Sequence, residues 1–276
     1  MKMLKFLFLC MSSLVLCSCA TLPSNYLSLA DNARLQIEDI VGQIKDRKVV
    51  FIGEGHMNGA DHLVQLEIIR RLHESGKKVA VAMEMFTDKK NPSLRKWSNG
   101  NIGDAEFKRE YAAEWTVPFH YYADIFLYAQ DKRIPLFGLN ADKTTINHIA
   151  KYGPGAIGSD MREKLKFTTC AEEPQYETAM KAYEDRTKTS HSAALPFLCD
   201  AQRARDATMA YNLANIIGSS EGVVIVLIGS AHASKVAMPN MLRNHLNVNY
   251  AVLIPRSFAG LTGKDVSAGM ADYIWY

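Results

Sequence analysis

The chain has 276 residues, of which 48% are hydrophobic, 22% charged and 9% aromatic. This balance excludes an intrinsically disordered chain and a polytopic membrane protein, and it is typical of one or two packed domains. The 32 basic and 29 acidic residues give a formal net charge of +3. We expect no nucleic-acid partner, because the sequence has no basic arm, acidic tail or basic patch interleaved with aromatic residues.

The N-terminus indicates export from the cytoplasm. A short basic segment over residues 1–5 precedes an apolar run over 6–16, which is too short to remain as a membrane-spanning anchor. The run ends in Leu16-Cys17-Ser18-Cys19, which resembles the bacterial lipobox. This resemblance implies a signal peptide over 1–18, cleavage before Cys19 and a lipid on its sulfur. An ordinary secretory signal with a coincidental cysteine is the alternative.

The residue after the lipobox indicates which membrane holds the anchor. Ala20 stands where an inner-membrane retention signal would often place Asp. We therefore expect a lipid anchor in the outer membrane, with the protein facing the periplasm, and a tether over residues 20–26. Stable anchoring needs more than one acyl chain, which lipoprotein processing supplies.

Two cysteines remain after the predicted cleavage. In an oxidising periplasm Cys170 and Cys199 can pair as a disulfide, and two buried, unpaired thiols are the alternative. Neither lies in a CxxC motif or beside a catalytic partner. We expect no catalytic role for either cysteine.

The rest of the chain alternates apolar strand patterns with helical ones. Short runs rich in β-branched residues predict buried parallel strands over 48–53, 78–83, 134–139, 223–228 and 248–254. Pro135 fits only the start of a strand or an edge strand, and residues 272–276 can add a further edge strand. Helices between these strands predict right-handed crossovers, and therefore an α/β fold whose parallel sheet is covered by helices on both faces.

The predicted helices set the domain boundaries. A helix over 61–75 has Asp61 as its expected N-cap and ends at Gly76, and residues 91–131 are mainly helical. The segment 142–199 has no convincing strand and is predicted to be a smaller inserted helical subdomain. The expected organisation is a tether and first helix over 19–47, this insertion, and a sheet domain formed by 48–141 and 200–276.

Polar side chains follow the ends of four predicted strands. Glu54 and His56 follow the first strand, and Glu84 follows the second. Asn140 follows the third strand, and His232 follows the fourth in a Gly-x-x-His spacing that matches Gly53 to His56. The carboxyl ends of parallel strands form one edge of a sheet, where ligands of open α/β sheets bind. Two carboxylates and two imidazoles at this edge can hold a metal or act as acid–base partners.

Several of these motifs together resemble a known family. The two Gly-x-x-His motifs, Met83-Glu84-Met85, Gly138-Leu139-Asn140 and the helix over 200–210 resemble, in this order, the ChaN family of haem-binding lipoproteins. That family belongs to the wider group of TraB/Tiki proteins and erythromycin esterases. The resemblance covers residues 48–254. It implies a parallel sheet with a small helical domain, non-covalent haem binding for iron acquisition, an outer-membrane haem receptor as partner, and haem held between two copies of the chain.

The haem ligand has to be chosen among several tyrosines. The sequence has no CxxCH motif, so covalent c-type attachment is excluded. A phenolate suits ferric haem that must later be released, whereas paired imidazoles suit electron transfer. We predict Tyr176 as the iron ligand and Tyr183 as the second choice, with Lys181 and His191 as partners of the haem propionates. The other candidate tyrosines are Tyr121, Tyr122 and Tyr152.

A second hypothesis places a hydrolase at the sheet edge. The resemblance to the wider group suggests that Glu54, His56, Glu84 and His232 bind a divalent metal or activate water. On the helix over 200–210, Arg205 and Asp206 form a buried salt bridge that fixes the helix or, alternatively, line the site. The other histidines lack metal-ligand spacing and are predicted to be solvated or structural; they are His62, His73, His120, His148 and His245.

Overall fold

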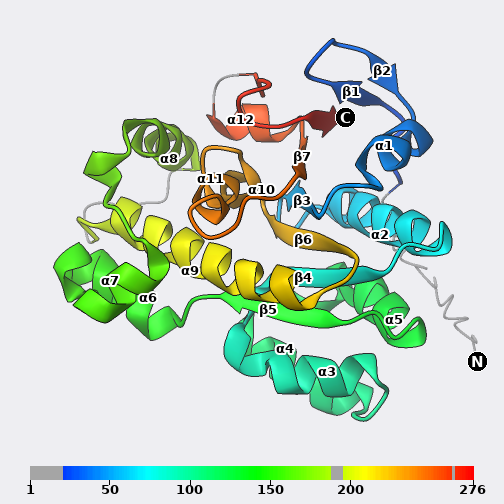
Figure 1. Cartoon of the computed structure of the whole chain (residues 1–276), viewed down its shortest axis with the longest axis horizontal. Helices are drawn as coiled ribbons and strands as arrows, with labels where there is room; N and C mark the ends of the chain where they lie inside the picture. Colours follow the sequence, from blue (N-terminus) through cyan, green and yellow to red (C-terminus); the bar gives the residue numbers. More distant parts are fainter. Residues whose placement is uncertain (1–20, 188–194, 263–264) are drawn as a thin grey trace, which may run out of the picture.

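The computed structural model describes residues 21–187, 195–262 and 265–276, with the side chains of all these residues except 182–187 and 261–262. The predicted signal peptide, Cys19 and His191 lie outside the described residues. A central sheet with helices on both faces forms the core of the described chain (Figure 1).

The sheet has eight strands in the order β2-β1-β8-β7-β3-β6-β4-β5. The strands are β1 Tyr26–Ser28, β2 Arg34–Leu35, β3 Val49–Glu54, β4 Val79–Thr87, β5 Leu136–Asn140, β6 Val223–Gly229, β7 Tyr250–Pro255 and β8 Tyr273–Trp275. The six strands from β8 to β5 are parallel, and β1 pairs antiparallel with β8 and β2. The prediction of an edge strand over 272–276 was wrong, because β8 lies between β1 and β7. The antiparallel pair lies in the segment where we expected only a tether and a helix. Pro135 precedes the edge strand β5, which satisfies the predicted constraint.

Helices connect and cover the strands. They are α1 Ile37–Ile44, α2 Gly59–Glu74, α3 Asn91–Ser98, α4 Asp104–Glu114, α5 Ala123–Asp131, α6 Lys143–Tyr152, α7 Ser159–Leu165, α8 Pro174–Thr187, α9 Leu198–Ser219, α10 Ser230–Ala233, α11 Met238–Leu242 and α12 Phe258–Thr262. Short 3₁₀ turns are η1 Asp88–Lys90, η2 Phe119–Tyr121, η3 Pro154–Ala156 and η4 Cys170–Glu172. The predicted α/β fold is therefore confirmed.

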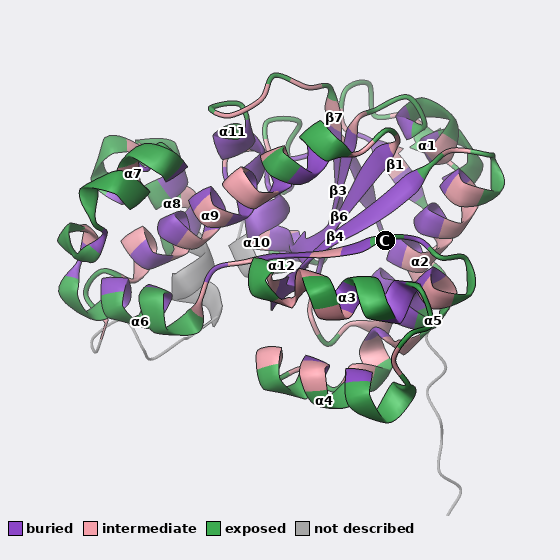
Figure 2. Ribbon diagram, turned by 60° about the horizontal axis from the view of Figure 1, so that its bottom comes forward, coloured by how far each residue is buried: buried purple, intermediate pink, exposed green. Residues whose placement is uncertain are grey.

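The sheet separates two hydrophobic cores. Successive residues of β3 point to opposite faces, so Val49 and Phe51 join one core and Val50 and Ile52 join the other. The first core includes residues of α6, α9 and α11, and the second includes residues of α1, α2 and α5. Figure 2 shows the buried strands between partly exposed helices. Burial on both faces explains the continuous apolar runs of the strands.

The predicted start of the helix after β3 was wrong by two residues. Helix α2 begins at Gly59, and the side chain of Asn58 accepts a hydrogen bond from the backbone nitrogen of Ala60. Asp61, the predicted N-cap, is buried and accepts hydrogen bonds from the backbone nitrogen of Gly55 and from Nε1 of Trp275. Its carboxylate thus fixes the loop after β3 against the last strand.

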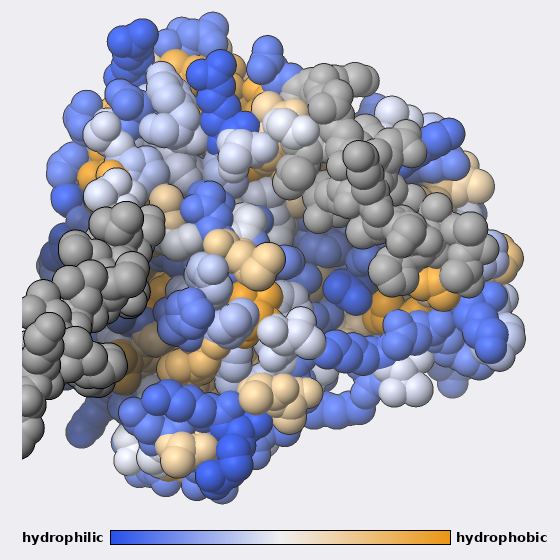
Figure 3. All heavy atoms as spheres, turned by 180° about the vertical axis from the view of Figure 1, so that it is seen from behind, coloured by the Kyte–Doolittle hydropathy of each residue, from blue (hydrophilic) through white to orange (hydrophobic). Residues whose placement is uncertain are grey.

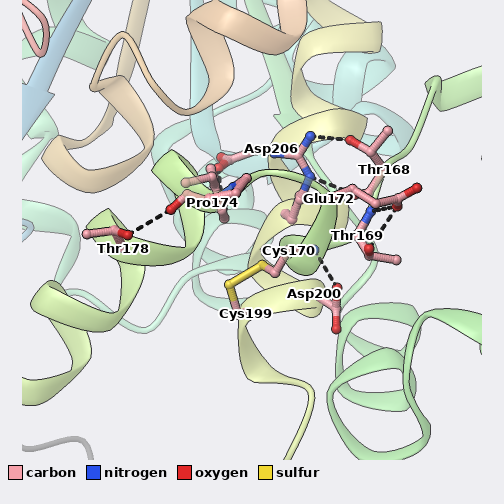
Figure 4. Close-up of a disulfide and its surroundings, with 11 residues drawn as sticks. Thr168, Thr169, Cys170, Glu172, Pro174, Thr178, Cys199, Asp200 and Asp206 are labelled. Carbon is pink, nitrogen blue, oxygen red and sulfur yellow. Dashed lines mark hydrogen bonds between the residues drawn. A yellow bond between two sulfur atoms is a disulfide. The ribbon is translucent and has the colours of Figure 1, made fainter.

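Residues of the insertion pack on helix α9, which spans one face of the sheet. The side chains of Ile146, Leu165 and Met180 belong to the same hydrophobic core as the buried residues of α9. The predicted disulfide between Cys170 and Cys199 is confirmed and joins η4 to the start of α9 (Figure 4). Because α8 follows η4 directly, this bond limits how far α8 can move from α9.

The surface is largely hydrophilic on the side seen in Figure 3, where hydrophobic residues form small separate groups. Within the described ranges, no helix is both long and apolar enough to cross a bilayer.

Replacing both cysteines by serine should destabilise the protein. The disulfide closes a loop with a sequence separation of 29 residues, and its loss should lower the free energy of unfolding by roughly 2–4 kcal/mol. Urea unfolding of the Cys170→Ser/Cys199→Ser variant and of the oxidised protein measures this difference. Equal unfolding free energies would show that the bond does not constrain the insertion.

Candidate functional site

Three neighbouring strands bring the predicted polar residues to the carboxyl edge of the sheet. Glu54 ends β3, Glu84 lies near the end of β4, and Gly229 ends β6. Strand β6 lies between β3 and β4, and Glu54 pairs in register with Gly229. His232 lies on α10, the short helix that follows β6 directly. The strand order therefore positions the site.

Glu54 is buried and its two carboxylate oxygens are both occupied. Its Oε1 lies 2.8 Å from Nδ1 of His56 and accepts a hydrogen bond from the hydroxyl of Tyr122. Its Oε2 accepts a hydrogen bond of 2.7 Å from Nε2 of Gln65 and lies 3.4 Å from Nδ1 of His62. These partners offset the cost of burying a carboxylate.

Glu84 lies between the two histidines of the Gly-x-x-His motifs. Its Oε2 accepts a hydrogen bond of 2.9 Å from the backbone nitrogen of Gly229. Its Oε1 lies 3.7 Å from Nη1 of Arg205 and 3.7 Å from Nε2 of His232. Burial alone would raise the pKa of Glu84, but the positive charges of His232, His56 and Arg205 lower it below its ordinary value. Glu84 is therefore ionised.

A third buried carboxylate, Asp206 on α9, connects the edge of the sheet to the helical insertion. Its Oδ1 lies 2.6 Å from Nδ1 of His232, and its Oδ2 accepts a hydrogen bond of 2.7 Å from the hydroxyl of Tyr176. Burial would lower the pKa of His232, but Asp206 and Glu84 raise it. Burial and the charge of Asp206 hold the pKa of Tyr176 well above its ordinary value, so this phenol is protonated.

The site thus contains the same arrangement twice. Two chains of phenol, carboxylate and imidazole end at His56 and at His232, and the charge of Glu84 acts on both imidazoles. In each chain the carboxylate holds Nδ1 of the histidine, which leaves Nε2 as the nitrogen available to a ligand. His56 is the more accessible of the two, with 37% of its side chain exposed against 11% for His232.

Position 229 requires glycine because the side chains of His56 and Glu84 lie close to its backbone. A Cβ atom at this position would lie 2.9 Å from Cε1 of His56 and 3.5 Å from Oε2 of Glu84. Any larger residue would push the imidazole away from the carboxylates. The glycine of the second Gly-x-x-His motif therefore has a steric cause.

Helix α9 directs both Arg205 and Asp206 toward the site. Arg205 lies near Glu84, and Asp206 contacts His232 and Tyr176. The expected salt bridge between the two neighbours was wrong, because each side chain has a different partner. Asn140 reaches the same region, where its Nδ2 donates a hydrogen bond of 2.8 Å to the backbone oxygen of Glu84.

The described residues contain no group of three or more His, Cys, Asp or Glu side chains that could hold a metal ion. Glu54 and Asp206 each pair with Nδ1 of a histidine. The divalent metal of the hydrolase hypothesis stays a prediction, and we derive no step that uses one.

Three of the residues predicted to hold haem, Tyr176, Lys181 and Tyr183, lie on α8. Tyr176 is buried, Lys181 is exposed, and Tyr183 lies in the last part of α8, with its side chain outside the described part. Of the other tyrosines, Tyr152 on α6 is 58% exposed and Tyr122 is bound to Glu54. His191 and Cys19 lie outside the described residues, so their predicted roles stay predictions.

An apolar hollow of about 170 Å³ lies beside Tyr176, between α8 and the segment from α10 to α12. Its lining residues include Ala179, Met180, Phe258 and Met270. Such a surface suits a flat apolar ligand. The hollow adjoins the insertion, whereas the paired histidines lie at the edge of the sheet.

Sequence analysis missed three partners of the sheet-edge carboxylates. We classed His62 as solvated or structural and Tyr122 as a haem candidate, and did not consider Gln65, yet all three contact Glu54. The available signal was the spacing of His62 and Gln65, which are one turn apart on the helix that follows the first Gly-x-x-His motif.

His56 should be protonated at neutral pH. Burial lowers its pKa, but the hydrogen bond to Glu54 and the charges of Glu84 and Glu54 raise it from 6.5 to about 9. Stability from this charge is therefore complete below pH 6.5 and is lost as the pH rises through about 9. NMR titration of the imidazole should show this pKa, and Glu54→Gln should lower it. An ordinary value in the unsubstituted protein would contradict the proposed pairing; Glu106→Gln, a change of an exposed residue on α4, is the control.

The comparisons with known proteins agree with this fold. A protein-family model described as "Haem-binding uptake, Tiki superfamily, ChaN" matches residues 40–242. A search of curated proteins gave no match. Among solved structures, ChaN of Campylobacter jejuni with cofacial haem binding has a TM-score of 0.68 at 17% identity, covering 91% of this chain and 95% of that chain.

Two further solved structures are more distant. The type III effector HopBA1 has a TM-score of 0.48 at 14% identity, covering 87% of this chain and 91% of that chain. The erythromycin esterase EreC has a TM-score of 0.49 at 13% identity, covering 83% of this chain and 76% of that chain. The match of the family model spans most of the sequence, and the chain therefore belongs to the haem-binding uptake family ChaN of the Tiki superfamily.

Proposed function

We propose that this protein binds haem non-covalently and delivers it for iron acquisition at the cell envelope. Membership of a haem-binding uptake family over residues 40–242 carries the proposal. The apolar hollow beside Tyr176 supports it, because a phenol can bind ferric iron, and the hydroxyl of Tyr176, which is bonded to Asp206 in this structure, would reach the iron by turning toward the hollow.

The size of the hollow supports haem binding between two copies of the chain. Its volume of about 170 Å³ is well below that of pockets that enclose a drug-sized ligand, which is roughly 300–1,000 Å³. One chain would therefore cover only part of a porphyrin, and the exposed apolar face would need a second cover. We propose that a second copy supplies it, as a haem-linked homodimer.

Tyr176 is the proposed iron ligand. Its hydroxyl donates a hydrogen bond to Asp206, so that carboxylate is placed to receive the proton when the phenol binds iron as a phenolate. Tyr183 follows seven residues later, which puts it two turns along the same side of α8 and makes it the second choice. Lys181 and His191 are the proposed partners of the propionates.

The proposed location follows from the lipobox. A lipid on Cys19 would hold the protein in the outer membrane facing the periplasm, where it exchanges haem with an outer-membrane haem receptor. Residues 20–25 precede β1 and would form the tether. A tether of this length keeps the folded part within roughly 20 Å of the membrane surface.

Hemin titration tests the proposal. Purified full-length protein should form a saturable high-spin ferric complex by absorption spectroscopy. Tyr176→Phe should weaken hemin binding at least about tenfold and remove the phenolate charge-transfer band. Tyr276→Phe is the matched control, because Tyr276 is an exposed tyrosine outside the insertion and is not a candidate ligand, so its loss should leave the spectrum unchanged.

Three results have defined meanings. Loss of the complex in Tyr183→Phe alone would move the ligand along α8 and keep the proposal. If neither Tyr176→Phe nor Tyr183→Phe changes the spectrum, a phenolate of α8 is not the iron ligand. No saturable complex at all would overturn haem binding.

A second candidate function is hydrolysis at the sheet edge. Two histidines, each held through Nδ1 by a buried carboxylate, flank the ionised Glu84. At neutral pH, His56 carries a proton that its Nε2 can donate to a leaving group, and Glu84 can accept one from water. This acid–base arrangement uses only residues of the chain.

Turnover of an activated ester tests this second candidate. Hydrolysis should slow as the pH rises through about 9, because His56 loses the proton that it donates. His56→Gln should reduce kcat by roughly 10²-fold or more, whereas His120→Gln, a change of an exposed histidine, should not. A rate equal to the uncatalysed background, or equal rates for both variants, would contradict it.

A further inference from the structure

Two adjoining hollows lie at the amino edge of the sheet, opposite the site described above. Their volumes are about 530 and 420 Å³, and both are bordered by Gly76, Lys77, Lys78, Glu221 and Gly222. The walls are the turns that precede β3, β4, β5, β6 and β7. The two hollows therefore form one continuous concave surface along the starts of these strands.

This surface is strongly basic. Seven lysine and arginine side chains line it, against two carboxylates, Asp46 and Glu221. The basic residues are Lys45, Arg47, Lys48, Lys77, Lys78, Lys132 and Arg133. In the whole chain the balance is 32 to 29, so the excess of positive charge is concentrated here.

Part of this charge has no carboxylate partner in the described part of the chain, and Nζ of Lys48 donates a hydrogen bond to the backbone oxygen of Ser220. Lys77 pairs with Asp46 at 2.7 Å, Lys78 pairs with Glu221, and Lys132 pairs with the neighbouring Asp131 at 2.9 Å. The other four side chains have no carboxylate within ion-pair distance among the described residues; they are Lys45, Arg47, Lys48 and Arg133.

The ends of helices explain only part of the basic residues. Helices α1, α2, α5 and α9 end at this edge, and a helix C-terminus attracts cations. Each end carries roughly half a negative charge, so four ends amount to about two. Together with the two carboxylates, this leaves positive charge unbalanced.

Arg133 adds a backbone observation. Its φ is +52°, in the left-handed region, at the end of α5 where the backbone nitrogen of Ile134 bonds the oxygen of Ala129. This helix ending normally favours glycine, and a side chain there strains the backbone. The chain therefore places at this surface a guanidinium that has no carboxylate partner among the described residues, in a conformation that glycine would adopt at lower cost.

We propose that this surface binds a soluble anion that carries at least two phosphate groups. Arg133 and Lys132 line one hollow, Arg47 and Lys48 line the other, and the shared wall lies between them, so the phosphates of one ligand can occupy both. Guanidinium groups bind phosphate oxygens through two parallel hydrogen bonds, and lysines add point charges. The concave shape favours a soluble ligand over a flat layer of lipid headgroups.

The test uses tripolyphosphate as the probe and calorimetry on the purified full-length protein. Arg133→Gly should weaken binding about two- to fivefold, which is the contribution of an exposed charge pair. The same variant should be at least as stable as the unsubstituted protein, because glycine relieves the left-handed backbone. Added NaCl should weaken binding further.

Lys166→Gly is the matched control. Lys166 also has a positive φ, of +48°, but it lies at the end of α7 and lines neither hollow. This variant loses the same charge and gains the same backbone freedom, so tripolyphosphate affinity should not change. If both variants bind tripolyphosphate more weakly by the same factor, the effect comes from net charge alone, and the proposed site is overturned.

Two other results would also overturn the proposal. The first is no measurable binding of tripolyphosphate at low salt. The second is binding to phosphatidylglycerol vesicles, but not to tripolyphosphate, that Arg133→Gly weakens, since that would make the surface a membrane contact. Neither result bears on haem binding, because the hollows and α8 lie on different parts of the fold.

Discussion

Three carboxylates with at most 3% of their surface exposed, Glu54, Glu84 and Asp206, are the constraint on which the architecture of the carboxyl edge depends. An unpaired buried ion costs several kcal/mol, so each carboxylate must be matched by donors held in place. The imidazoles of His56 and His232 supply donors to Glu54 and Asp206, and the backbone nitrogen of Gly229 supplies one to Glu84. The orientation of helices α2, α9 and α10 is therefore fixed by hydrogen bonds to these carboxylates as well as by hydrophobic packing.

The sequence predicted the fold well because its strands are buried on both faces. A strand with helices on both sides is apolar along its whole length, and this pattern is visible without neighbours. The ends of such strands are also marked in the sequence, because polar residues follow the apolar runs directly, and this pattern predicts Glu54, Glu84 and His232 at one edge of the sheet. The antiparallel pair β1–β2 was not predicted, because strands of two or three residues are too short to show an alternation of apolar and polar residues.

Contacts between distant elements were not predictable from residue types. Tyr122 follows Glu54 by 68 residues and Tyr176 precedes Asp206 by 30, and nothing in either local sequence indicates a phenol bound to a carboxylate. The expected pairing of Arg205 with Asp206 failed for the opposite reason. Neighbours on a helix point in directions about 100° apart, so each meets a different partner.

Asp206 links the two functions proposed for the carboxyl edge. Its oxygens bind the phenol of Tyr176, which would hold iron, and the imidazole of His232, which lies beside Glu84, the proposed base in hydrolysis. Transfer of the phenol proton to Asp206 would neutralise this carboxylate, and its charge would then no longer raise the pKa of His232. Occupancy of α8 by haem would thus change the electrostatics of the sheet edge without any movement of the strands. Substitutions at Asp206 would alter both functions, whereas those at Tyr176 and His56 address each one directly.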